Sequence, residues 1–123
     1  MNLDFANLLN CNFGESMLKN ASMRQARISK SSFVGANLIS ADLFKVIAKD
    51  CNFSKSRLAR ADMREGDFEN SNFNEASLYE ANLERANLQF CTLTNTDLNR
   101  AHITGLRGSV ANGPLNSVPV QQI

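Results

Sequence analysis

Residues 81–90 read Ala-Asn-Leu-Glu-Arg-Ala-Asn-Leu-Gln-Phe, which is two five-residue units that both begin Ala-Asn-Leu. The same spacing continues in both directions. Every fifth residue from Leu3 to Ile103 is apolar: of these 21 positions eleven are Leu, five Phe, two Met, two Ile and one Ala. The residue two places before each, from Ala6 to Ala101, is small in 19 of 20 positions, with Val46 as the exception. The phase of the repeat never slips.

A period of five fits neither an α-helix, which repeats every 3.6 residues, nor a flat strand, which repeats every two. It requires a backbone that turns a corner every five residues and always points the same position inward. The pattern therefore predicts an all-β solenoid, with few strands that satisfy strict hydrogen-bond criteria and no long helix before residue 104.

The repeat resembles that of the pentapeptide-repeat family, through units such as 36–38, 41–43 and 86–88, which read Ala-Asn-Leu, Ala-Asp-Leu and Ala-Asn-Leu. This resemblance implies a right-handed four-sided β-helix (β-solenoid) of about five coils with twenty residues each. We divide the chain into a β-helix over residues 1–105 and an irregular C-terminal cap or flexible tail over residues 106–123, where Gly and Pro are frequent.

The charged residues test the coil length independently of the resemblance. In a twenty-residue coil, residue n lies directly beside residue n+20, and side chains so placed should carry opposite charges. Nine pairs at this separation are oppositely charged and one is like-charged, whereas a separation of 15 gives five against seven. The nine pairs are Asp4–Arg24, Lys30–Asp50, Lys45–Glu65, Lys49–Glu69, Lys55–Glu75, Arg60–Glu80, Arg64–Glu84, Glu65–Arg85 and Glu80–Arg100.

The apolar positions form matching columns at the same spacing. One column is predicted to stack four phenylalanines, and a second consists of leucine alone. A third column contains a small Ala48 and a large Phe68, and each is offset by a neighbour of opposite size, Val46 and Gly66, as a close-packed interior demands. The first two columns are Phe13, Phe33, Phe53 and Phe73, followed by Leu93, and Leu18, Leu38, Leu58, Leu78 and Leu98.

No set of side chains in the sequence predicts catalysis, a cofactor or a metal site. Cys11, Cys51 and Cys91 lie forty residues apart, or two coils, which is about 10 Å and too far for a disulfide. We interpret them as small packing residues. His102, the single histidine, lacks a clear partner for acid–base chemistry, and no phosphate-binding loop is present. We therefore expect a non-enzyme without cofactors.

The overall charge gives no argument for nucleic acid binding, because thirteen basic and twelve acidic residues leave a net charge of +1. The distribution is uneven, however, at +5 for residues 1–60 and −4 for residues 61–123. No apolar run is long enough to span a bilayer, and the start of the chain lacks the pattern of a secretory signal. With reduced thiols, these features favour a cytoplasmic location.

Outward-pointing apolar residues are the first candidates for a contact surface. We expect Val34, Ile39, Phe44 and Ile47 in the second and third coils to contact a protein partner. Further residues of this kind are Phe5, Leu9 and Met17 in the first coil and Tyr79 and Phe90 further along.

The ends of the solenoid are the second candidate, because an end coil leaves its core open and its backbone unpaired. At the N-terminal end the open core would consist of Leu3, Leu8, Phe13 and Leu18. These residues are candidates for end-to-end contact, and a homodimer through an open coil end would cover them.

Taken together, the sequence favours a non-catalytic solenoid that binds a protein partner or acts as a scaffold. The resemblance implies one alternative, since some family members mimic B-form DNA, bind type II topoisomerases such as DNA gyrase and confer antibiotic resistance. Those proteins are strongly acidic rods, unlike this chain at +1. A second alternative is a structural module of a larger bacterial or effector protein.

Overall fold

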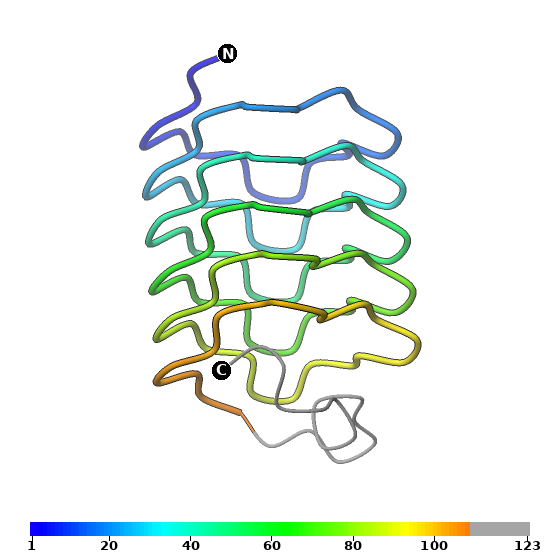
Figure 1. Ribbon diagram of the computed structural model, residues 1–123. Coiled ribbons are helices and arrows are strands. Elements are labelled where there is room, and N and C mark those ends of the chain that lie inside the picture. The colour runs from blue at the N-terminus through cyan, green and yellow to red at the C-terminus, as the bar shows by residue number, and fades with distance from the viewer. Residues whose placement is uncertain (109–123) are drawn as a thin grey trace.

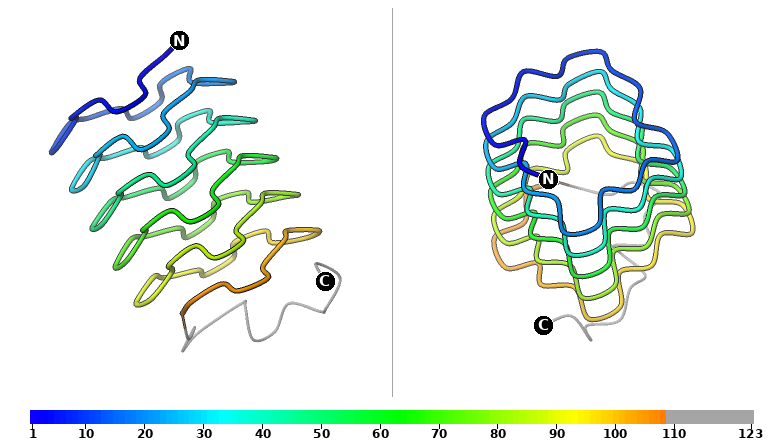
Figure 2. Two further views of the ribbon diagram at one scale, coloured as in Figure 1. Left: turned by 90° about the vertical axis from the view of Figure 1, so that its left-hand side faces the viewer. Right: turned by 90° about the horizontal axis from the view of Figure 1, so that it is seen from above.

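The chain winds around a single axis, coil upon coil (Figure 1). The computed structural model describes residues 1–108, and parallel backbone bridges join single residues twenty positions apart, from Asn2 with Ser22 to Asn87 with Arg107. Seen from above, successive coils superimpose (Figure 2). The twenty-residue spacing that the charges predict is therefore the spacing of the backbone.

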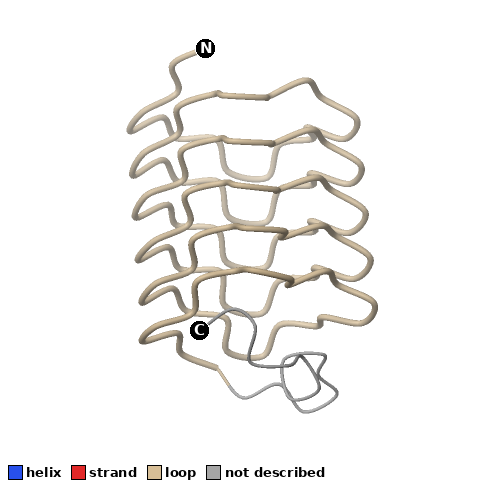
Figure 3. Cartoon of the chain, in the orientation of Figure 1, coloured by secondary structure: helices blue, strands red, loops and turns tan. Residues whose placement is uncertain are grey.

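Residues 1–108 contain no helix and no strand longer than one bridged residue (Figure 3). The reason is local, since two of every five residues are used by a turn at the corner. Four such units complete a coil, and we call them sides 1 to 4, which in the first coil are residues 1–5, 6–10, 11–15 and 16–20.

Hydrogen bonds between coils follow one rule throughout. Each bridged residue turns both of its backbone groups toward the preceding coil. Ser22, for example, donates its N–H to the carbonyl of Met1 at 2.9 Å and accepts a bond from the N–H of Leu3 at 2.6 Å. The coils are thus joined by backbone bonds on all four sides, which makes the wall of the solenoid continuous.

Each corner is closed by a turn whose third residue has a left-handed backbone. Residues 5, 10, 15 and so on to 105 all have positive φ, and two of them, Gly35 and Gly105, are glycines. A bond such as that from the N–H of Ala41 to the carbonyl of Leu38, at 3.0 Å, closes the turn. Positive φ at this place is the requirement of a type II turn.

The second residue of a unit, where it is Asn or Asp, stabilises the turn at the end of that unit. The Oδ1 atom of Asn52 accepts a hydrogen bond from the N–H of Ser54 at 2.9 Å, and Asp42 does the same for Phe44 at 3.1 Å. This is the local bond by which Asn and Asp side chains stabilise turns. It explains why these residue types recur at this position.

The core contains the predicted columns. The rings of Phe13, Phe33, Phe53 and Phe73 stack with centroid separations of 5.0, 5.1 and 4.9 Å and interplanar angles of 10° or less. Stacking of this kind adds about 0.5–1.5 kcal/mol per pair beyond the burial of the rings. All five members of the leucine column, from Leu18 to Leu98, are buried.

The predicted compensation of size also occurs at Phe68. Its ring lies edge-on to Phe53, one coil back, and to Phe73, with centroids 5.9 and 5.8 Å away. A Cβ atom on Gly66 would lie only 2.5 Å from this ring. The glycine therefore makes room for the phenylalanine, which leans toward the coil that holds the small Ala48.

Cysteine and serine alternate in one inward column of side 3, and from Ser31 onward their side chains donate hydrogen bonds to the backbone of the preceding coil. The hydroxyl of Ser71 donates to the carbonyl of Ala48 at 2.8 Å and accepts the N–H of Cys51 at 3.0 Å. Ser31 bridges Leu8 and Cys11 in the same way. These buried hydroxyls take the place of the direct bond that closes other corners.

The repeat geometry extends slightly beyond the expected boundary at residue 105. Arg107 still bridges Asn87, and the N–H of Leu106 still donates to Ile103 at 3.0 Å. The remainder of the expected cap or tail, residues 109–123, lies outside the described residues.

Candidate interaction surfaces

Salt bridges run along the outside of the solenoid from coil to coil. Five of the nine predicted pairs lie within 4.0 Å, and two acidic residues, Glu65 and Glu80, each pair with a cation on both neighbouring coils. The five are Lys45–Glu65 at 4.0 Å, Lys49–Glu69 at 3.7 Å, Arg60–Glu80 at 2.8 Å, Arg85–Glu65 at 3.6 Å and Arg100–Glu80 at 3.7 Å.

Two arginines of side 1 form salt bridges with residues other than Asp4 and Glu84, their predicted partners. Arg24 pairs with Asp42 at 2.9 Å, and Arg64 pairs with Asp62 at 2.7 Å. Burial opposes ionisation of Asp62, but hydrogen bonds from Arg64 outweigh it and hold the pKa of this carboxyl below its usual value. In these pairs both guanidinium groups also lie over one aromatic ring.

That ring belongs to Phe44, which the sequence placed in a candidate contact patch. The guanidinium carbon of Arg24 lies 4.6 Å from the ring centroid and that of Arg64 lies 5.0 Å from it, so cations cover the ring from both neighbouring coils. The Lys45 ammonium lies 5.5 Å away. Phe44 is half-buried by these cation–π contacts and presents less apolar surface than its sequence position predicts.

The other three residues of that candidate patch lie on different sides of the solenoid. Val34, Ile39, Phe44 and Ile47 belong to four successive units, and four units complete a coil. Val34 and Ile39 are half-buried at corners, and Ile47 is 39% exposed. The structure does not gather the four on one face, because sequence proximity here means moving around the coil.

The large apolar side chains that are most exposed lie elsewhere. Within residues 1–108 they gather in the first coil, with a single further example, Phe90, in the fifth coil. The residues and their exposed fractions are Met1 76%, Phe5 70%, Leu9 51%, Met17 79% and Phe90 72%. In the first coil, Leu3, Leu8 and Phe13 are also half-exposed at the open end, whereas Leu18 is buried.

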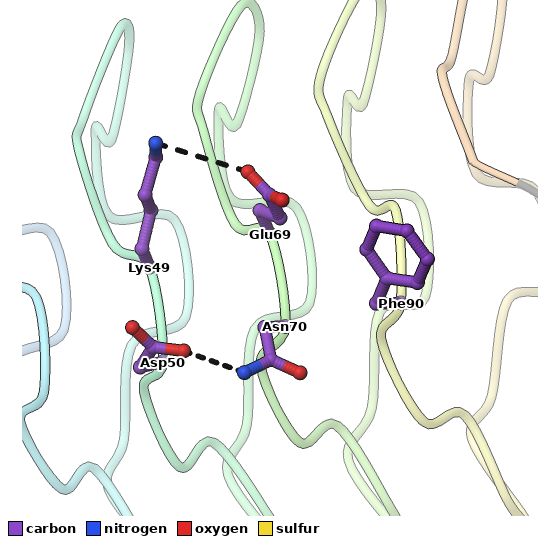
Figure 4. Close-up of a pocket in the computed structure, with 5 residues that line it drawn as sticks. All are labelled: Lys49, Asp50, Glu69, Asn70 and Phe90. Carbon is purple, nitrogen blue, oxygen red and sulfur yellow. Dashed lines mark hydrogen bonds and ion pairs between the residues drawn. The ribbon is translucent and has the colours of Figure 1, made fainter.

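Phe90 borders a shallow depression on the outside of side 2, at its corner with side 3 (Figure 4). Lys49 pairs with Glu69 there, and the Nδ2 group of Asn70 donates to Asp50 at 2.6 Å. Phe90 has a φ of 63°, a backbone conformation that disfavours bulky side chains. The corresponding residues of the preceding coils are Asn10, Lys30, Asp50 and Asn70, all polar.

The cysteines are structural in this fold. Burial raises the pKa of the Cys51 and Cys91 thiols to about 11, so neither forms a thiolate at neutral pH. All three cysteines are free. Over residues 1–108 no cluster of three or more His, Cys, Asp or Glu could hold a metal ion, and His102 is exposed.

Comparison with known proteins agrees with this geometry. A model of pentapeptide repeats matches in eight copies, over residues 2–33, 36–74, 51–89 and 81–107. The chain belongs to the pentapeptide-repeat family. Members fold as right-handed quadrilateral β-helices and are generally non-catalytic structural or binding proteins. The predicted fold and its handedness are those of the family.

Three solved structures illustrate the likeness. The pentapeptide repeat protein Rfr23 from the cyanobacterium Cyanothece 51142 is 27% identical, with a TM-score of 0.73 over 88% of this chain and 84% of that one. A pentapeptide repeat protein from the Arabidopsis thaliana thylakoid lumen is 21% identical, with a TM-score of 0.49 over 91% and 72%. QnrB1, a plasmid-mediated fluoroquinolone resistance protein, is 11% identical, with a TM-score of 0.49 over 98% and 78%.

Comparison with curated protein sequences finds no match. Within residues 1–108 the structure also has no helix with the length and apolar character needed to cross a membrane.

Proposed function

We propose that this pentapeptide-repeat protein is a non-catalytic protein-binding module whose contact surface centres on Phe90. One observation carries the proposal, namely that Phe90 is 72% exposed and also has a positive φ. The corresponding residues of the preceding coils, Asn10, Lys30, Asp50 and Asn70, also have positive φ but are polar, so Phe90 differs from them by exposing an aromatic ring on this backbone. Such a residue is retained where it gains energy from a contact.

The surroundings of Phe90 fit a protein partner. Interfaces commonly place an aromatic anchor beside charged and amide groups that form a polar rim. Lys49, Asp50, Glu69 and Asn70 supply such a rim in the depression beside the ring. The wall beneath is held by backbone bonds between coils, so the anchor is presented on a rigid surface and little is lost in ordering it.

Two alternative functions, DNA mimicry and a purely structural role, predict different surfaces. A DNA mimic that binds topoisomerases needs a continuous acidic surface, whereas Glu65 and Glu80 are each paired with two cations. This pairing favours general protein binding. A structural module of a larger protein would use the solenoid only as a spacer, and would not need an exposed Phe90. The free thiols are compatible with the cytoplasm, where we propose that the protein acts.

The test is affinity capture with a matched pair of variants. Immobilised wild-type protein, Phe90→Asn and Phe5→Asn are exposed to the same lysate, and each captured protein is then purified and titrated against all three. Asn suits a positive φ and occurs naturally at Asn10 and Asn70 of the Phe90 column. We expect Phe90→Asn to weaken partner binding by about tenfold or more, as for an anchor residue, and Phe5→Asn to bind like wild type. Equal binding by all three proteins would refute the role of Phe90.

A further inference from the structure

Within residues 1–108 the first coil holds most of the exposed large apolar side chains. Phe5, Leu9 and Met17 point outward from it and are 70%, 51% and 79% exposed. The residues that follow them in the same columns, as far as residue 97, are all polar. They are Gln25, Lys45, Glu65 and Arg85 after Phe5, Ser29, Lys49, Glu69 and Gln89 after Leu9, and Asn37, Arg57, Ser77 and Asp97 after Met17. We call Phe5, Leu9 and Met17 the apolar collar.

The collar surrounds a coil end with backbone N–H and C=O groups that are free to form hydrogen bonds. Bridged residues direct both N–H and C=O toward the preceding coil, and in the first coil these residues are Asn2, Asn7, Asn12 and Met17. Within the described residues no protein group binds these eight backbone atoms. A residue that presents both groups on one edge can exchange two hydrogen bonds with a residue of an antiparallel strand.

Antiparallel pairing is what results when two copies of this end face one another across a two-fold axis. If bridged residues pair with bridged residues, four registers are possible, in which Asn7 lies opposite Asn7, Asn2, Asn12 or Met17 of the second copy. Each register fixes the neighbour of every outward side chain, because opposed residues of antiparallel strands share a face. The four can therefore be compared directly.

In one register every collar residue faces another collar residue of the second copy. When Asn7 lies opposite Asn7 of the second copy, Phe5 faces Leu9 of that copy and Met17 faces its Met17. Glu15 then faces Lys19, twice by symmetry, so these opposite charges are paired as well. In the other three registers each collar residue faces a polar side chain or glycine. Phe5, for example, faces Lys19, Asp4 or Gly14.

We propose that the first coil is a self-complementary interface, through which two copies of this chain join head to head in the register that places Asn7 and Met17 on the two-fold axis. Head-to-tail stacking is disfavoured, because Phe5 would then follow Gly105 in its column and would lose the apolar neighbour Leu9. The contact would also cover the half-exposed core residues Leu3, Leu8 and Phe13.

The size of the interface predicts a reversible dimer. Three residues of each unit run along a side, and at about 3.3 Å each they span roughly 10 Å between the corner turns. With outward side chains, two facing ends would bury on the order of 1,000 Å² in total, near the lower limit of specific interfaces. We therefore expect a concentration-dependent equilibrium between monomer and dimer, which sedimentation velocity measures directly.

The first test compares two phenylalanines in sedimentation velocity. Phe5→Lys and Phe90→Lys change the same residue type at equivalent corner positions, with 70% and 72% exposure and φ of 62° and 63°. We expect Phe5→Lys to weaken dimerisation by about tenfold or more, as for loss of a central apolar contact, and Phe90→Lys to leave it unchanged. A wild-type protein that is monomeric at all concentrations would overturn the proposal.

The second test reports the register. In a Cys11→Ser background, Asn7→Cys places two thiols across the two-fold axis at a Cα separation of about 5.5 Å, which permits a disulfide. Asn12→Cys is the control, since Asn12 is equally exposed but faces Asn2 of the second copy. We expect covalent dimers of the first variant only. Cross-linking of Asn12→Cys, or of neither variant, would overturn the register.

A charge exchange completes the design. Glu15→Lys and Lys19→Glu should each weaken dimerisation, and the double variant should restore it toward wild type, because only their mutual pairing is re-created. Additive losses in the double variant would contradict the pairing. These results are independent of the proposed partner surface, because loss of dimerisation through Phe5 and loss of partner binding through Phe90 are measured separately.

Discussion

At the scale of single residues, the interior tolerates few exchanges even where the repeat appears uniform. Ala occupies ten of the twenty positions that lie two residues before each central apolar residue, yet Gly66 cannot be replaced freely, because a Cβ atom there would lie 2.5 Å from the Phe68 ring. Gly66 with Phe68 fills the local core volume by combining a small and a large residue, and Val46 with Ala48 does so in the reverse order.

Gly66→Ala should therefore destabilise the protein by about 1–3 kcal/mol, the usual cost of overpacking. Phe68→Leu removes the clash but leaves space beside Ala48. The double variant Gly66→Ala with Phe68→Leu should be no less stable than Phe68→Leu alone. Urea unfolding of the four proteins measures the coupling. Simple additivity of the two losses would show that the ring and the glycine are independent.

The cysteines provide a second prediction at this scale. Burial raises the pKa of Cys51 and Cys91 to about 11, and both thiols are buried, whereas Cys11 is half-exposed. At pH 8 a disulfide reagent such as DTNB should titrate one thiol rapidly in the folded protein and all three in urea. Rapid reaction in a Cys11→Ser variant would contradict the assigned burial.

At the scale of the five-residue unit, the polar second residue is expected to stabilise the turn at the end of its own unit. Asn52→Ala removes the acceptor for the N–H of Ser54 and should cost about 0.5–1.5 kcal/mol, a typical net value for one hydrogen bond. Asn52→Asp keeps an oxygen at the same place and is the control. Thermal unfolding followed by circular dichroism compares the two variants, and equal losses would argue against the bond.

At the scale of the whole molecule, acid should unfold the protein in part through its carboxylates. Hydrogen bonds with Ser22 and Arg24 lower the pKa of Asp4, and those from Arg64 lower the pKa of Asp62 against the effect of burial. A carboxyl whose folded pKa lies below its unfolded value stabilises the fold above the unfolded value, about 3.9. That stability is lost as the pH falls through the folded pKa.

We therefore expect the urea midpoint to stay nearly constant from about pH 7 to about pH 5 and to fall below about pH 4, where these carboxyls bind protons. Asp62→Asn should reduce the fall, because one such group is gone, and Asp97→Asn serves as a control for a change of net charge. A fall of the same size in wild type and Asp62→Asn would show that other groups dominate.

Much of this architecture is predictable from sequence because every coil repeats the same physical problem. The period of five, the twenty-residue spacing and the stack of Phe13 to Phe73 all follow from residues that must point inward. The contact surface is different, because it depends on which side of the coil an outward residue occupies. Val34, Ile39, Phe44 and Ile47 are close in sequence and lie on four sides.

The partial burial of Phe44 could not be predicted from the sequence either. Two arginines from neighbouring coils cover its ring, and the repeat does not determine their rotamers. By contrast, the exposed Phe5, Leu9 and Met17 are visible once each outward column is aligned at a spacing of twenty and compared for polarity. Column-wise comparison is thus the signal by which sequence alone can locate contact residues in such a chain.

The two nested spacings, five and twenty, have an evolutionary consequence. Loss or gain of five residues would preserve the inward and outward alternation, yet rotate everything downstream by a quarter turn, so that Phe33 would no longer meet Phe53 and cations would lose their acidic neighbours. Only changes in multiples of twenty preserve both spacings. Lineages of this protein should therefore differ in length by whole coils, while shorter insertions should be confined to the corners as outward bulges.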